Sequence, residues 1–211
     1  MGKASRGKRD TAVDSRRDRV EAMRAADVRS QRRRNLLWLT ACVVAIALVA
    51  GFTYWGTHRT TSERDELASQ VSTYTGLTEN HTTKAVTYPQ TPPVGGDHDS
   101  TWLNCGIYDK AVRNENAVHS MEHGAVWITY DPSLSAEDVQ KLRDQMPSSF
   151  VILSPYDGLP APVVASAWGV QLKLTGVDDP RLKTFIDVYR QGSQTPEPGA
   201  SCDGGTGTPI A

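Results

Sequence analysis

The chain has 211 residues and a formal net charge of −1, but the charge is unevenly distributed. Residues 1–35 contain 12 Lys/Arg and 5 Asp/Glu, a net +7, whereas residues 36–211 contain 11 basic and 19 acidic side chains, a net −8. Such asymmetry indicates that the two segments face different surroundings. Residues 1–35 have few bulky apolar side chains, which excludes a buried core there, and we expect this arm to be disordered or weakly helical.

The basic arm suits anionic lipid head groups. Nucleic acid is the alternative partner for a segment with this charge. No aromatic platform accompanies the arginines, so we expect no nucleic-acid binding.

An uncharged segment follows the arm, from Leu36 to Tyr54. Its 19 residues, at about 1.5 Å each, span roughly 28 Å, close to the hydrocarbon thickness of a bilayer. Three arginines at 32–34 precede it, and aromatic residues including Trp38 and Trp55 mark its ends. This pattern predicts a single transmembrane helix with a cytoplasmic N-terminus and an extracytoplasmic C-terminal domain.

Two alternatives compete with a retained membrane anchor. Ala45-Ile46-Ala47 could serve as the cleavage site of a signal peptide, although the uncharged run and the preceding arm are long for one. Leu39-Thr40-Ala41-Cys42 resembles a lipoprotein signal, but only six residues separate Cys42 from the polar flank. We therefore interpret Cys42 as a small apolar residue of the span.

Beyond the span, we expect a helix from Ser62 to about Tyr74, with Ser62 as N-cap. Lys84–Tyr88 is predicted to be a short strand, followed by a loop rich in proline and glycine that ends at His98. Alternating apolar and polar residues and helix-start signals then predict strand, helix, strand, strand, strand and helix. The predicted ranges are 125–130, 135–145, 150–154, 163–168, 170–174 and a final helix opened by Asp179-Pro180.

This order predicts an α+β fold, in which an α/β-sandwich domain with a mostly antiparallel sheet carries its helices on one face. About 115 residues are enough for one hydrophobic core. We divide the chain into an arm (1–35), a transmembrane helix (36–57), a stalk or docking helix (58–76), the extracytoplasmic domain (77–192) and an irregular C-terminal tail (193–211).

Metal-ligating residue types concentrate in residues 104–130 and just upstream of them. His119-Ser120-Met121-Glu122-His123 contains two imidazoles and a thioether, and His98 lies in the preceding loop. On a strand, positions 119, 121 and 123 would share one face, whereas on a helix positions 119 and 123 are neighbours. Gly124 would suit the end of a short helix. Either geometry lets both imidazoles reach one metal, so the predicted ligands are His98, His119, His123 and Met121.

Imidazole combined with a thioether favours copper, whereas imidazole combined with a carboxylate favours zinc as the alternative cofactor. Asp97, Asp99 or Glu122 could orient the ligands from outside the coordination sphere. The competing interpretation is structural, with the histidines holding loops together through hydrogen bonds.

Residues 119–123 also match H-x-x-E-H, in which two histidines bind zinc and the glutamate activates water. Glu197 could be imagined as the third ligand, but its segment is rich in proline and glycine. The chain has no glycine-rich phosphate loop, no G-x-S-x-G elbow and no dinucleotide-binding fingerprint. An enzymatic role is therefore not the favoured interpretation.

Cys105 and Cys202 are the only cysteines after the span. Outside the cytoplasm such a pair favours a disulfide, which would join the tail to the central segment. The alternative is a free Cys105 thiolate that acts as a copper ligand or a nucleophile. The absence of a C-x-x-C motif argues against a thioredoxin-type oxidoreductase.

Several motifs together resemble a known family. They are Pro92-Pro93-Val94-Gly95-Gly96-Asp97-His98, then Trp102, then Asn104-Cys105-Gly106-Ile107-Tyr108, and then Glu115 to Gly124. These residues resemble a bacterial membrane-anchored family catalogued as domain of unknown function 3105, over most of residues 62–205. The resemblance implies an N-terminal anchor in the bacterial cell membrane and an extracytoplasmic domain, with no settled activity. Asp97 stands where that family usually has proline or a similar residue, and the histidine that follows is kept.

The leading hypothesis is a membrane-anchored extracytoplasmic domain that binds metal, with copper favoured, and handles metal near the lipid bilayer. A second hypothesis is a non-catalytic interaction or assembly subunit with a membrane-protein partner. A third is a zinc-dependent hydrolase that uses Glu122 as its base.

Overall fold

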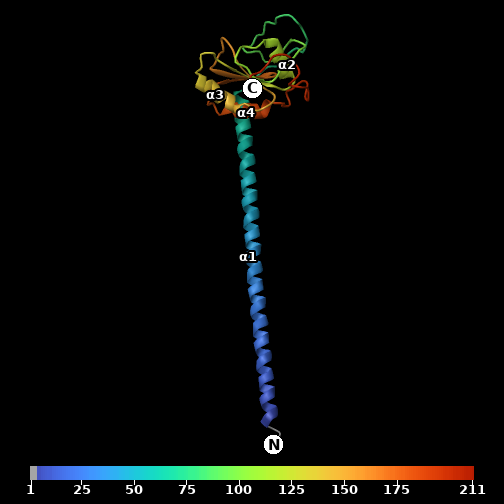
Figure 1. Ribbon diagram of the computed structural model, residues 1–211, viewed down its shortest axis with the longest axis vertical. Coiled ribbons are helices and arrows are strands. Elements are labelled where there is room, and N and C mark those ends of the chain that lie inside the picture. The colour runs from blue at the N-terminus through green and yellow to red at the C-terminus, as the bar shows by residue number, and fades with distance from the viewer. Residues whose placement is uncertain (1–3) are drawn as a thin grey trace. The chain divides into compact units, whose positions relative to one another are not determined.

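The computed structural model describes residues 4–211, with side chains described for residues 21, 23–24, 27–56 and 62–211. The chain divides into two compact units, Met1–Thr60 and Thr61–Ala211. Helix α1 (Ala4–Gln70) makes up the described part of the first unit and extends into the second. The strands and the remaining helices belong to the second unit (Figure 1).

Helix α1 includes one stretch, Asp27–Gly56, that is long and apolar enough to cross a membrane. Its large apolar side chains are exposed, as Phe52 shows with 74% of its surface accessible. A membrane anchor and a signal sequence share these features. The helix includes the arm from Ala4 onward, where we expected disorder or weak helix, and the first three residues lie outside the described part. Residues 4–70 contain no proline, so nothing interrupts α1 at Ser62, where we expected a new helix to start.

The second unit is built on a six-stranded sheet with the order β1-β6-β5-β3-β4-β2. The strands are β1 (Ser72–Thr73), β2 (Gly106–Ile107), β3 (Val126–Tyr130), β4 (Val151–Pro155), β5 (Val163–Ala167) and β6 (Val170–Leu174). Pairs β1–β6, β6–β5 and β5–β3 are antiparallel, and pairs β3–β4 and β4–β2 are parallel. The α+β fold with a mostly antiparallel sheet is therefore confirmed.

The four longer strands match the predicted ones to within one residue at each end. Gly169, at φ +70°, makes the turn between β5 and β6, as predicted. Helix α3 (Ala136–Gln145) connects the parallel strands β3 and β4 and starts at Ser135, whose hydroxyl accepts the Asp138 N–H. The expected strand Lys84–Tyr88 is wrong, since these residues form a loop.

The sheet has two differently covered faces because side chains alternate along each strand. On the face that we call the scaffold face, Val126 and Ile128 of β3 pack with Leu142 of α3 and with α4 (Arg181–Tyr189) through Leu182 and Phe185. This face fits the expected helix-covered side.

On the opposite face, which we call the histidine face, Trp127 of β3 packs with Ala117, Val118 and Met121 of α2 (Asn114–Glu122). Helix α2 therefore departs from the expectation that the helices lie on one face. The reason is the apolar residue Trp127, whose alternate position on β3 points away from α3 and α4.

The C-terminal segment, residues 193–211, has no helix or strand but packs along residues 102–107. Leu103 pairs with Thr206, and the Ile107 N–H donates to the Ala211 carbonyl at 2.8 Å. A disulfide joins Cys105 to Cys202, with Cα atoms 5.4 Å apart, as predicted. The segment is thereby held beside the helix that carries two of the histidines.

Candidate metal centre

Helix α2 carries His119 and places His123 at its C-cap, so the helical interpretation of this stretch is confirmed over the strand. Glu115 lies in the first turn, where a carboxylate is favoured by the helix dipole. The helix ends at Glu122 with His123 as C-cap, and Gly124 follows, whose φ of +101° suits glycine and whose N–H donates to the Met121 carbonyl. The chain then enters β3 within two residues, which fixes α2 against the sheet.

The loop before α2 supplies His98 and brings a second histidine to it. The His98 N–H donates to the Asn80 carbonyl at 3.0 Å, and the Thr82 N–H donates to the His98 carbonyl at 2.7 Å. This parallel bridge sets His81 directly beside His98. Sequence reasoning missed His81, because a single histidine in a polar loop carries no periodic or motif signal.

Three buried histidines donate from Nδ1 to main-chain carbonyl oxygens. The pairs are His98 to Gly96 at 2.8 Å, His119 to Asp99 at 2.6 Å and His123 to Ser201 at 2.6 Å. A carbonyl can only accept a hydrogen bond, so Nδ1 carries the proton in each ring. The neutral ring then has its lone pair on Nε2, which is the usual arrangement of histidines that ligate metals.

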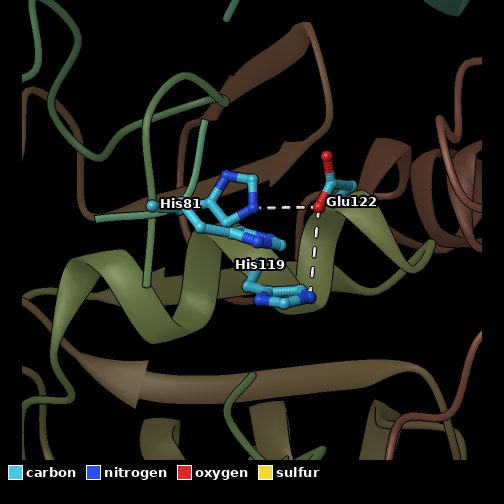
Figure 2. A group of neighbouring side chains, drawn as sticks. His81, His119 and Glu122 are labelled. Carbon is cyan, nitrogen blue, oxygen red and sulfur yellow. Dashed lines mark ion pairs between the residues drawn. The ribbon is translucent and has the colours of Figure 1, made fainter. Parts of the chain in front are cut away.

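Four side chains form the first group, which we call the inner site: His81, His98, His119 and Glu122. One ligand atom from each lies within 4.8 Å of every other, and all but His81 are buried (Figure 2). Glu122 Oε2 lies 2.9 Å from Nε2 of His98 and 4.0 Å from Nε2 of His119. Nε2 of His98 is fully buried, and its partner among the described residues is the Glu122 carboxylate, with which it forms an ion pair.

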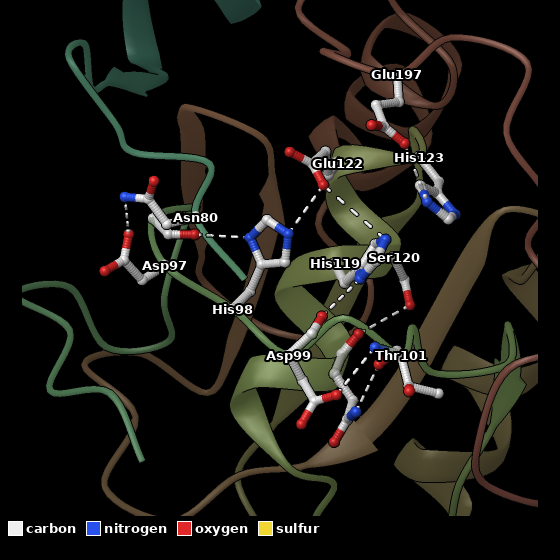
Figure 3. Close-up of polar contacts among 12 residues, drawn as sticks. Asn80, Asp97, His98, Asp99, Thr101, His119, Ser120, Glu122, His123 and Glu197 are labelled. Atoms are coloured by element: carbon white, nitrogen blue, oxygen red, sulfur yellow. Dashed lines mark hydrogen bonds and ion pairs between the residues drawn. The ribbon is translucent and has the colours of Figure 1, made fainter. Parts of the chain in front are cut away.

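Three side chains form the second group, which we call the outer site: His119, His123 and Glu197. The rings of His119 and His123 have centroids 4.5 Å apart, and Glu197 Oε2 lies 3.5 Å from Nε2 of His123. In Figure 3, Glu122 faces His98 and His119, whereas His123 and Glu197 lie together farther along α2. The proline- and glycine-rich tail thus brings Glu197 to a histidine without a helix, contrary to our expectation.

The inner site has a defined electrostatic character. Burial lowers the pKa of His98, but the Glu122 carboxylate and the Gly96 carbonyl outweigh it and raise the pKa overall. Burial also lowers the pKa of His119, and the neighbouring histidines keep it low despite the Asp99 carbonyl. Burial raises the pKa of Glu122, yet contact with His98 leaves it below its ordinary value. An ionised carboxylate therefore faces the imidazole nitrogens.

Polar contacts hold the main chain that orients His119. The Asp99 carboxylate lies 2.5 Å from Nη1 of Arg113 and accepts the Thr101 N–H at 2.9 Å. The Arg113 guanidinium and the Thr101 N–H hold the pKa of the Asp99 carboxyl below its usual range, with the Thr101 N–H contributing most. Asp99 therefore contributes its carbonyl oxygen, rather than its carboxylate, to the orientation of His119.

Three other residues that the sequence analysis named as ligands or supporting residues do not contact the imidazoles of the inner site. Met121 is fully buried in the apolar cluster with Trp127 and Ile152. It lies on the side of α2 away from His119 and His123, because positions two apart on a helix point in nearly opposite directions. Cys105 is bonded to Cys202 and is not a free thiolate. Asp97 accepts a hydrogen bond from Asn80 Nδ2 at 3.0 Å rather than contacting an imidazole.

His98 and His123, which we predicted as ligands of one metal, fall into different groups joined by His119. Of the four predicted ligands, the structure brings His98 and His119 together, sets His123 in the outer site and packs Met121 into the core. Glu122 lies among the potential ligands themselves, whereas we expected it only to orient the ligands from outside the coordination sphere.

Comparison with known proteins gives one family. The family described as "Protein of unknown function (DUF3105)" matches residues 80–204, which include all the residues of both sites. No curated protein and no solved structure matches the chain. The match covers more than half of the sequence, and the chain belongs to this family of proteins of unknown function, DUF3105.

Proposed function

We propose that this protein is a membrane-anchored metal-binding protein whose inner site holds one zinc(II) or copper(II) ion. His81, His98, His119 and Glu122 are the proposed ligands. The observation that carries the proposal is the gathering of one ligand atom each from His81, His98, His119 and Glu122 within 4.8 Å of one another, with His98, His119 and Glu122 buried. Imidazole nitrogens and a carboxylate oxygen are ligands that suit zinc(II) and copper(II).

The orientation of the rings supports the same function. The main-chain carbonyls that bind Nδ1 of His98 and His119 leave Nε2 of each ring as the potential ligand atom. A structural role alone is satisfied by those Nδ1 bonds and does not require the Nε2 atoms to converge on a carboxylate. The convergence is what a metal needs.

The donor set bears on the choice of metal. The copper preference derived from the sequence relied partly on Met121, which packs in the core, and Cys105 is in a disulfide. Sulfur ligands select copper(I), whereas imidazole and carboxylate suit zinc(II) and copper(II). We therefore propose a divalent ion, with zinc on an equal footing with copper.

The apolar stretch Asp27–Gly56 is proposed as the membrane anchor. Three consecutive arginines at 32–34 precede its uncharged core, which supports a cytoplasmic N-terminus. The metal-binding domain would then lie outside the cytoplasm of a bacterial cell, where the disulfide between Cys105 and Cys202 would persist.

The two other hypotheses find less support. A zinc hydrolase would need Glu122 to activate water, but Glu122 is only 3% exposed and lies against His98. An assembly subunit would use the same histidines only as loop supports, which does not require ligand atoms of three histidines and a carboxylate to gather within 4.8 Å of one another.

The test is the metal content of the full chain without an affinity tag, purified in detergent, exposed to zinc or to copper(II) and then desalted. The matched variants are His98→Asn and His119→Asn, because the Asn amide can replace the Nδ1–H donor and cannot replace the Nε2 lone pair. We expect about one ion per chain in the wild type and loss of it in both variants. No retained metal, or equal retention in the variants, would contradict the proposal. The assembly-subunit hypothesis would then be the better supported one.

A further inference from the structure

His119 belongs to both the inner and the outer site. Its Nδ1 donates to the Asp99 carbonyl at 2.6 Å, so only Nε2 can bind a metal. One lone pair cannot serve two metals at once. The two sites therefore compete for His119, and an ion in either site leaves the other without one of its ligands.

The two sites lie next to each other. His119 and His123 are one helical turn apart, with ring centroids 4.5 Å apart, and the His119 ring lies 4.8 Å from that of His98. The main chain also links the sites, since the Glu197 N–H donates to the Glu122 carbonyl at 3.1 Å. An ion could thus pass from one set of ligands to the other while it remains bound to His119.

The two carboxylates differ in their access to solvent. The Glu122 side chain is 4% exposed, whereas the Glu197 side chain is 56% exposed. An exposed carboxylate attracts a hydrated cation and can bind it before the cation loses its water. The imidazole beside Glu197, that of His123, is buried and already oriented by the Ser201 carbonyl.

We propose that the outer site is the entry and exit position for the metal of the inner site. A divalent ion first binds Glu197 and His123, then gains His119, and finally exchanges Glu197 and His123 for His98, His81 and Glu122. Each step forms and breaks metal–ligand bonds only, so the ion keeps its charge and no electron is transferred. The inference rests on the proposed metal binding at the inner site.

The rate of metal exchange tests this inference. The full chain in detergent is loaded with zinc and mixed with an excess of a chelator, and the release of the ion is followed in time. Loading of the metal-free protein is followed in the same way. The variants are Glu197→Gln, which removes the charge at equal size, and His123→Asn, which keeps a donor for the Ser201 carbonyl. Glu137→Gln, on an exposed position of α3, is the matched control.

We expect both outer-site variants to retain about one zinc at equilibrium while loading and release slow about tenfold, equivalent to about 1.4 kcal/mol in the barrier. Glu137→Gln should match the wild type. Unchanged rates in both variants, with the bound zinc retained, would overturn the entry position and leave the inner site intact. A wild type that binds no zinc would instead overturn the proposed function, so the two failures are distinguishable.

Discussion

The two faces of the sheet bury different kinds of side chain. On the scaffold face, α3 and α4 cover the strands with apolar residues such as Leu142, Leu182 and Phe185, all fully buried. On the histidine face, α2 and irregular loops bury polar and charged groups beside an apolar cluster. These groups are His98, Asp99, Glu115, Asn116, His119, Ser120, Glu122 and His123.

Burial of apolar area stabilises a fold, whereas burial of polar groups is costly unless each is partnered. Most polar groups of the histidine face have partners, as Ser120 Oγ shows by donating to the Leu103 carbonyl at 2.7 Å. Nε2 of His98 is paired with the Glu122 carboxylate at 2.9 Å. The scaffold face thus contributes mainly apolar burial, whereas the histidine face carries the proposed metal site.

The largest effect on stability should come from the scaffold face. Phe185→Ala removes a fully buried ring and should lower the free energy of unfolding by about 3–5 kcal/mol. Denaturant unfolding of the full chain in detergent, followed by tryptophan fluorescence, measures this loss. Metal retained per folded chain should not change. A loss of metal without a loss of stability would contradict the assignment of stability to the scaffold face and of metal binding to the histidine face.

Removing the disulfide should destabilise the link between the tail and the histidine face. The bond closes 97 residues, and the double variant Cys105→Ser/Cys202→Ser should lose about 2–5 kcal/mol of stability. Because the tail carries Glu197 and the Ser201 carbonyl, metal loading should slow as in Glu197→Gln. The same unfolding and loading measurements check both effects. A double variant as stable as the wild type would show that the tail is held without the bond.

Asp179 provides a pH test confined to the scaffold side. Its carboxylate accepts from Arg181 and from Thr175, and Arg181 holds its pKa far below the ordinary value. Because the pKa is lower in the folded state, the ionised carboxylate stabilises the fold at pH values above the unfolded-state pKa of about 4. This stabilisation is lost as the pH falls toward the folded-state pKa. Asp179→Asn should therefore cost about 1–3 kcal/mol at pH 7 and progressively less below about pH 4. Unfolding curves from pH 7 to pH 3 measure this, and a constant cost across that range would contradict the assignment.

The smallest effect should come from Met121. Met121→Leu keeps the volume of a buried apolar side chain, so stability should change by less than about 1.5 kcal/mol. Bound zinc and bound copper should both be unchanged, because Met121 packs against Trp127 rather than facing the histidines. Selective loss of copper in this variant would show that the Met121 thioether is a copper ligand.

The local features of the fold were predictable because their signals are local. Ser135 as N-cap, Gly124 at the end of α2 and Gly169 in the hairpin each act on the nearest residues. Strands β1 and β2 could not be predicted, since two residues show no periodicity. The position of α2 on the second face depends on which side of β3 it packs against, and the order of elements does not specify that.

The candidate site was predictable only where its residues lie close in sequence. The H-x-x-E-H pattern gave His119, Glu122 and His123, and the glycine loop gave His98. His81 and Glu197 join the sites through contacts that link distant segments, a strand bridge for one and the tail for the other. The spacing of residues 119, 121 and 123 left Met121 among the ligands until the helix placed it in the core.

The most direct test of the inner site is X-ray absorption spectroscopy of the metal-loaded full chain. The account predicts a first shell of nitrogen and oxygen only, at about 2.0–2.1 Å for zinc, with the outer scattering of imidazole rings. His98→Asn and His119→Asn should abolish that signal. A sulfur shell at about 2.3 Å, or a shell without imidazole, would contradict binding by His81, His98, His119 and Glu122.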